Sequence, residues 1–129
     1  MYYLDTSAAA KLILSEPDSS AMRLWAESHD AELSSSDVLR AELHRAVRRH
    51  VPQALARVPV LLGTIVLSVI SAELWERAAR IEPPRLRTLD ALHLAAAMDL
   101  GSDLDAIVTY DERLAEAARA NGIATLSPR

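Results

Sequence analysis

The stretch that most constrains the fold is an almost wholly apolar helix predicted between Thr88 and Gly101. Thr88 can cap its first turn, and Gly101 supplies the left-handed residue that ends it. Because apolar residues occur all the way round, the helix is expected to be buried. Asp90 nevertheless lies in the first turn, where the helix dipole favours a negative charge. Asp90 is therefore either a structural partner of the helix end or one ligand of a buried metal site.

Composition places the chain among ordinary globular proteins. Its 129 residues are half apolar and a quarter charged, which predicts one domain over residues 1–129. The absence of cysteine and of a signal peptide predicts a cytoplasmic protein. The most apolar run, 58–70, is too short to span a membrane, so no membrane association is expected. The net charge of −4 argues against a general nucleic-acid coat protein.

Strand-like and helical patterns alternate along the chain. Strands are predicted over residues 2–4, 31–34, 64–69, 105–109 and 123–126, and helices over 8–14, 20–28, 38–50, 53–62, 71–81, 88–101 and 111–121. The continuous run at 64–69 is typical of a strand covered on both faces. The alternation predicts an α/β fold, a three-layer α/β/α sandwich around a short five-stranded parallel sheet. Ligands of such sheets bind beyond the carboxyl ends of the strands.

Four acidic residues are predicted to face that edge of the sheet. Asp5 follows the first strand, Asp111 follows the fourth, and Asp90 begins a helix that starts at the same edge. Glu42 lies among the apolar residues of the helix predicted over 38–50, so its side chain points inward. A carboxylate in that position is costly unless it is paired or bound to a cation.

Each acid taken alone also has a structural explanation. Asp5 and Asp111 could be helix N-caps, Asp90 could be a dipole partner, and Glu42 could pair with a buried arginine. Four acids at one edge favour a shared cation, because like charges held together need one and no lysine is near them in sequence. Oxygen ligands without His or Cys spacing indicate Mg²⁺ or Mn²⁺ rather than zinc. Such ions activate water against a phosphodiester.

Other polar residues flank these acids. The hydroxyls of Thr6 and Thr109 could orient a carboxylate or a metal-bound water. Arg85 and Arg87, just before the helix that carries Asp90, are candidates for binding a substrate backbone. His93 is interpreted as a hydrogen-bonded core histidine.

Four segments of the chain resemble the four sequence blocks of a PIN domain, and more narrowly those of the VapC-type toxins of bacterial toxin–antitoxin pairs. They are residues 3–7, the inward Glu42 within 40–43, and residues 90–95 and 108–114. The resemblance covers essentially the whole chain. It implies a PIN-like nuclease domain over residues 1–129, acting as an endoribonuclease that uses Mg²⁺ or Mn²⁺ to cleave RNA. It also implies a homodimer that is silenced by a small cognate antitoxin.

By that resemblance, the catalytic and metal-binding positions are Asp5, Glu42, Asp90 and Asp111. The fourth position is the most open, because Asp103 and Asp105 lie nearby in the sequence.

Two other functions are compatible with parts of the pattern. A phosphotransfer domain of the receiver or phosphatase type also places acids at strand ends, but it needs a lysine late in the chain, and Lys11 is the only lysine. A PIN-like domain that serves only as a binding module is the other alternative. The presence of all four acids argues against a binding module whose catalytic site has been lost.

Overall fold

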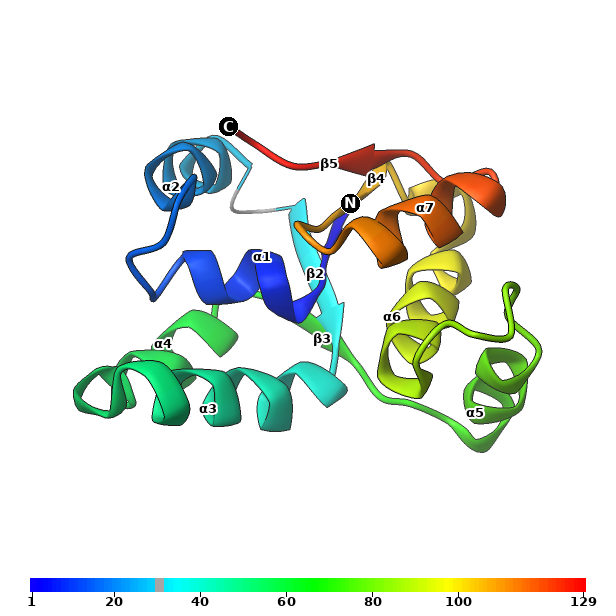
Figure 1. The fold of residues 1–129 in the computed structure, drawn as a ribbon, viewed down its shortest axis with the longest axis horizontal. Helices are drawn as coiled ribbons and strands as arrows, with labels where there is room; N and C mark the ends of the chain where they lie inside the picture. The colour runs from blue at the N-terminus through cyan, green and yellow to red at the C-terminus, as the bar shows by residue number, and fades with distance from the viewer. Residues whose placement is uncertain (30–31) are drawn as a thin grey trace.

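The computed structural model describes residues 1–29 and 32–129, and its centre is a five-stranded parallel sheet with helices on both faces (Figure 1). The strand order is β3-β2-β1-β4-β5, and the strands are β1 (Tyr2–Leu4), β2 (Leu33–Ser36), β3 (Val66–Ser68), β4 (Ala106–Val108) and β5 (Thr125–Leu126). The helices are α1 (Thr6–Lys11), α2 (Ser19–Glu27), α3 (Val38–His50), α4 (Arg57–Leu62), α5 (Ala72–Ala79), α6 (Thr88–Asp99) and α7 (Glu112–Ala120). Short 3₁₀ turns lie at Pro52–Ala54 and Gly101–Asp103. The predicted α/β fold is confirmed.

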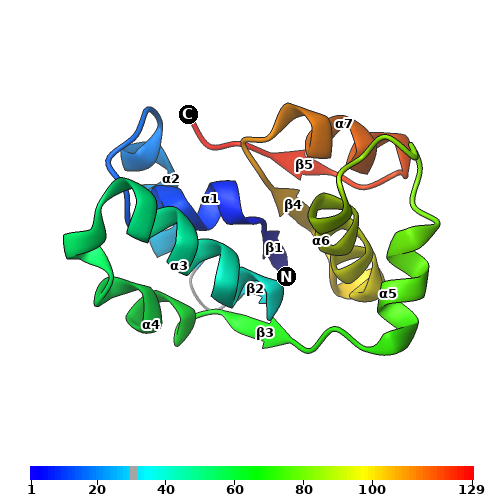
Figure 2. The ribbon, with the colours of Figure 1, turned by 60° about the horizontal axis from the view of Figure 1, so that its bottom comes forward.

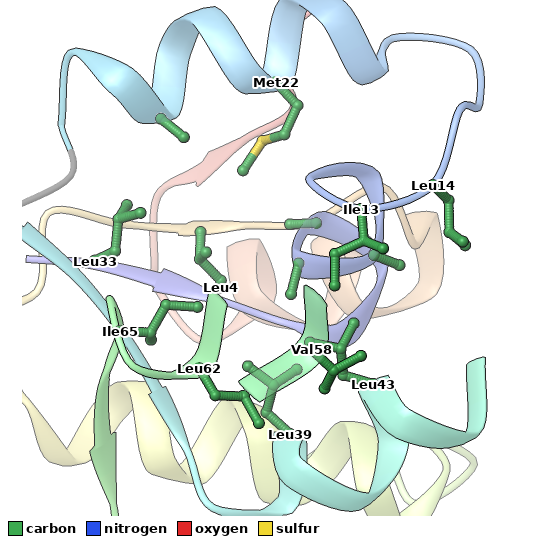
Figure 3. Packing of buried hydrophobic residues seen from close by; sticks show 14 of the residues in the cluster. Leu4, Ile13, Leu14, Met22, Leu33, Leu39, Leu43, Val58, Leu62 and Ile65 are labelled. Atoms are coloured by element: carbon green, nitrogen blue, oxygen red, sulfur yellow. The ribbon is translucent and has the colours of Figure 1, made fainter. Parts of the chain in front are cut away.

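The sheet separates two hydrophobic clusters. Because side chains alternate along a strand, Tyr3 belongs to one cluster and Leu4 to the other. The first cluster packs Leu4 against α1 to α4, and Figure 3 shows Met22 on one side of Leu4 and Leu39 and Val58 on the other. The second cluster joins the other face to α5, α6 and α7. Figure 2 shows these two groups of helices on opposite sides of the strands.

Helix α6 is buried as predicted, since every residue from Ala91 to Ala97 is buried. Its N-terminal boundary differs from the prediction. Arg87 is the N-cap residue, without a side-chain cap hydrogen bond, and Thr88 is already the first helical residue. Gly101 adopts φ +57° just after the helix, as a left-handed terminating residue should.

Strand β3 corrects the prediction of a strand covered on both faces. It lies at the edge of the sheet, and Val66 and Val69 are 59% and 78% exposed. β-branched residues suit the pleated backbone of any strand, so their run indicated a strand without locating it in the sheet. The predicted strand at 31–34 is found at Leu33–Ser36, and its position 31 lies outside the described residues.

Two predicted helices have different limits in the structure. The first begins at Thr6 because Asp5 accepts a hydrogen bond from the Ala8 N–H as its N-cap. The stretch 53–62 is divided into the 3₁₀ turn after Val51 and helix α4. None of the helices in the described residues has the length and hydrophobicity needed to cross a membrane.

Candidate active site

Asp5 lies directly after β1 and is only 4% exposed. Its Oδ1 accepts hydrogen bonds from Ser7 Oγ at 2.7 Å and the Ala8 N–H at 3.0 Å, and its Oδ2 accepts one from Thr109 Oγ1 at 2.7 Å. Burial raises the pKa of the Asp5 carboxyl, although the charge of His93 and these hydrogen bonds act in the opposite direction. A neighbouring cation would offset the cost of ionising this buried group.

Thr109 connects Asp5 to Asp111. Its Oγ1 donates to Asp5 and accepts from the Asp111 N–H at 3.0 Å. Asp111 uses Oδ1 to cap α7, accepting from the N–H groups of Arg113 and Leu114 at 2.9 and 3.3 Å. One carboxylate oxygen therefore holds the helix, while Oδ2 faces the site. Asp5 and Asp111 are helix caps, as the structural explanation of each acid supposed, and they are also neighbours across the sheet edge.

Glu42 points inward from α3, as predicted, and its side chain is 23% exposed. Its Oε1 accepts hydrogen bonds from Thr6 Oγ1 at 2.9 Å and from His93 Nε2 at 2.6 Å. Burial opposes ionisation of Glu42, but hydrogen bonds from His93 and Thr6 and the charges of His93 and Arg87 outweigh it, so the pKa of Glu42 is lowered.

His93 is a buried, hydrogen-bonded histidine, as interpreted from the sequence. His93 Nε2 lies 2.6 Å from Glu42 Oε1 and donates to that carboxylate, while His93 Nδ1 is hydrogen-bonded to the Tyr3 hydroxyl at 2.9 Å. A buried relay thus runs from β1 through α6 to α3. The sequence analysis missed the link to Glu42, although the spacing of Asp90 and His93 by one helical turn places both on one side of α6.

Arg87 joins the remaining two acids. Its Nε donates to Asp90 Oδ2 at 2.9 Å and its Nη2 donates to Asp111 Oδ2 at 3.0 Å, while its side chain is 66% exposed. The sequence argument found no lysine near the acids, and in the structure an arginine pairs with these two. Arg87 was expected to bind substrate, and in this structure its guanidinium lies on the acids instead.

The other predicted residues occupy different places. Thr6 contacts Glu42 and Thr109 contacts Asp5, whereas Arg85 lines a cavity that Asp90 also lines. Asp105 pairs with the N-terminal amine of Met1 at 2.6 Å, just before β4 begins. Asp105 and the nearby Asp103 therefore belong to the opposite end of β4 from Asp111.

The site as a whole presents oxygen donors from separate elements. Within residues 1–29 and 32–129, no three acidic or histidine side chains gather closely enough to hold a metal ion in this arrangement. The donor chemistry nevertheless fits a hard divalent cation, because the buried Asp5 carboxylate is flanked by the hydroxyl oxygens of Ser7 and Thr109. Ser7, which the sequence analysis did not single out, links Asp5 to the segment after β4. Its Oγ donates to Asp5 and accepts from the Tyr110 N–H at 2.8 Å.

Comparison with known proteins places the chain in a family. The family model described as "PIN domain" matches residues 2–120. "Ribonuclease VapC35" of Mycobacterium tuberculosis is 41% identical over 131 aligned positions, which cover 99% of this chain and 97% of that protein. "Ribonuclease VapC46" of the same organism is 37% identical, with 98% and 96% covered.

A solved structure agrees in fold. The crystal structure of VapC20 from Mycobacterium tuberculosis, described as a sarcin–ricin loop cleaving toxin, superposes with a TM-score of 0.78 at 18% identity, covering 99% of this chain and all of that one. The full-length match to proteins named as ribonucleases also sets aside the receiver, phosphatase and binding-module alternatives. The chain therefore belongs to the PIN-domain family, as a ribonuclease of the VapC type.

Proposed function

We propose that this ribonuclease cleaves RNA phosphodiesters with Mg²⁺ or Mn²⁺ held by Asp5, Glu42, Asp90 and Asp111. Ribonucleases of this family are generally dependent on a divalent metal. The supporting observation is the hydrogen-bonded chain from the buried Asp5 through Thr109 to Asp111 at the carboxyl edge of the sheet. A divalent cation there would polarise the phosphodiester and activate a water molecule.

The residues of the chain then have separate tasks. Thr109 and Ser7 fix the Asp5 carboxylate, while Thr6 and His93 fix Glu42 through its Oε1 and leave Oε2 available. This preorganisation limits the rearrangement needed when a cation binds.

We assign the arginines next to the acids to binding the phosphates of the RNA substrate. Arg87 is largely exposed, so its guanidinium can move from the two carboxylates to a phosphate oxygen of bound RNA. Arg85 lies two residues earlier in the segment before α6 and would contact a neighbouring phosphate.

We infer the binding partners of this chain from the VapC ribonucleases that it resembles. Because proteins named VapC match over the full length of the chain, we assign it a structured RNA substrate and a small cognate antitoxin. We further assign a homodimeric, cytoplasmic form in which residues 1–129 act as one nuclease domain. Arginine-rich surface beside the acids would attract an acidic antitoxin segment as it attracts RNA phosphate.

The test is cleavage of structured RNA in Mg²⁺ or Mn²⁺ by wild type and by Asp5→Asn and Asp90→Asn variants. Each substitution should reduce the rate by about 100-fold or more, and EDTA should abolish cleavage. Asp99→Asn is the matched control, because Asp99 ends the same helix as Asp90 but is 61% exposed and paired with Arg77. An Asp90→Asn protein that folds normally and cleaves as fast as wild type would falsify the assignment.

A further inference from the structure

A cavity of about 680 Å³ lies beside the acids, and most of its lining residues have no role in the function proposed above. One wall is a face of α7, because four of its lining residues follow the i, i+3, i+4, i+7 spacing: Arg113, Glu116, Ala117 and Ala120. The opposite wall is the segment 82–87, which approaches α7 before α6 begins (Figure 2). Its volume lies within the range of pockets that bind small organic ligands.

The cavity is continuous with the acidic site. Arg87 and Asp90 belong to its lining, and Arg87 and Arg113 also line a more open hollow of about 530 Å³ that includes Ser7 and Asp111. Arg87 therefore borders both spaces. A chain-like ligand with a phosphate over the acids would place its next group in the cavity.

The charges and surfaces of the cavity match a nucleotide. Arg85, Arg87 and Arg113 supply cations for phosphate oxygens. Leu86 and the exposed Ala120 supply an apolar surface against which the face of a base can pack.

The polar groups on the walls favour hydrogen-bond donors on that base. The Asn121 amide nitrogen donates to the carbonyl oxygens of Glu82 at 3.1 Å and Ala117 at 2.8 Å, which leaves its Oδ1 to accept. The Glu116 carboxylate is also an acceptor. Guanine presents two donor groups side by side on its Watson–Crick edge, N1–H and the N2 amino group, and a carboxylate can accept from both.

We propose that this cavity binds the base of a nucleotide adjoining the scissile phosphate, and that Glu116 makes it selective for guanine. The inference rests on the proposed function, since it supplies the specificity of that same site. A side chain of a protein partner is the rival occupant. The arginines together with the acceptors Glu116 and Asn121 Oδ1 favour the nucleotide, because a nucleotide carries both an anionic phosphate and hydrogen-bond donors on its base.

The first experiment measures binding without catalysis. Guanosine, adenosine, cytidine and uridine 5′-monophosphates are titrated against the protein in EDTA and followed by NMR. Wild type should bind the guanine nucleotide about tenfold more tightly than the others, as expected for one bidentate contact. Glu116→Gln should remove most of that preference. Ala120→Leu, which fills the cavity, should weaken the binding of all four nucleotides. Ala72→Leu, at the exposed first residue of α5, is the matched control and should bind like wild type.

The second experiment maps cleavage sites in a randomised RNA pool by sequencing. Wild type should cut at a fixed position relative to guanine, and Glu116→Gln should still cut but with that preference relaxed. Cleavage by wild type without any guanine preference, together with equal binding of the four nucleotides, overturns the inference and leaves the proposed function intact. Guanine binding without any metal-dependent cleavage overturns the proposed function instead. If Ala120→Leu leaves nucleotide binding and cleavage unchanged but loses a co-purifying protein, a protein side chain occupies the cavity and the inference is wrong.

Discussion

At the scale of single residues, the contacts of Arg87 are the largest difference between the site predicted from the sequence and the site in the structure. The positions of the four acids along the chain are visible in the sequence, and the structure brings them to one edge of the sheet. The guanidinium that bridges Asp90 and Asp111 depends on the conformation of the segment before α6. No local pattern specifies that conformation, so the sequence identified Arg87 as a neighbour of the acids but not as their partner.

Arg87 should compete with a divalent cation for the carboxylates. We expect Arg87→Gln to tighten Mn²⁺ binding a few-fold in the absence of RNA, because an exposed ion pair is worth less than about 1 kcal/mol. The same variant should cleave RNA more slowly, since it loses a phosphate contact. Calorimetric titration with Mn²⁺ measures the first effect, with Arg85→Gln as the control. Unchanged or weaker Mn²⁺ binding by Arg87→Gln would show that the bridge does not oppose the metal.

Asp5 makes stability depend on pH. Burial raises the pKa of its carboxyl above 3.8, so the folded state holds this proton more tightly than the unfolded state. The resulting stabilisation is complete below the unfolded pKa and is lost as pH rises through the folded pKa. Asp5→Asn should therefore melt a few degrees higher than wild type in EDTA at about pH 8, and the difference should shrink as the pH falls through the folded-state pKa of Asp5. A variant that melts lower than wild type at about pH 8 would mean that lost hydrogen bonds outweigh the relieved desolvation.

At the scale of elements, the strength of the local pattern determined which predictions succeeded. Helix α3 has the predicted limits of Val38–His50, where an amphipathic stripe ends at a proline two residues later. Strand β3 was recognised from its β-branched residues, but its place at the sheet edge depends on pairing with β2, which is distant in sequence. The relay through His93 was missed for the same reason, because it joins three elements.

That relay should make β1 and α6 energetically coupled. His93→Leu leaves the buried Tyr3 hydroxyl without its Nδ1 partner, so we expect a loss of about 2–4 kcal/mol in the free energy of unfolding. Tyr3→Phe removes the same hydroxyl, so the double variant should lose less than the sum of the two single changes, by about 0.5–3 kcal/mol. Urea unfolding of the four proteins measures this difference. Simple additivity would show that the Tyr3–His93 hydrogen bond does not contribute to stability.

At the scale of the whole molecule, the candidate site lies where the two halves of the fold meet. Asp5 and Glu42 belong to elements on the side of α1 and α3, whereas Asp90 and Asp111 belong to α6 and the start of α7. The sheet-edge rule predicts a common edge for these residues, because every parallel strand ends at the same edge. The cavity between α7 and the segment before α6 was not predictable, because its walls meet only in the folded chain.

A cation shared by all four acids should therefore stabilise the molecule through both halves at once. A free cation concentration of about 100 times the dissociation constant adds about 2.7 kcal/mol to the free energy of unfolding. We expect wild type to show this gain in Mn²⁺ relative to EDTA, and both Glu42→Gln and Asp111→Asn to lose most of it, because each removes a ligand from a different half. Asp99→Asn, remote from the site and exposed, should keep the full gain. Thermal melts of the four proteins in EDTA and in Mn²⁺ provide the measurement. If Asp111→Asn loses the gain while Glu42→Gln keeps it, the cation is held from the α6 and α7 side alone, and the four-acid assignment is wrong.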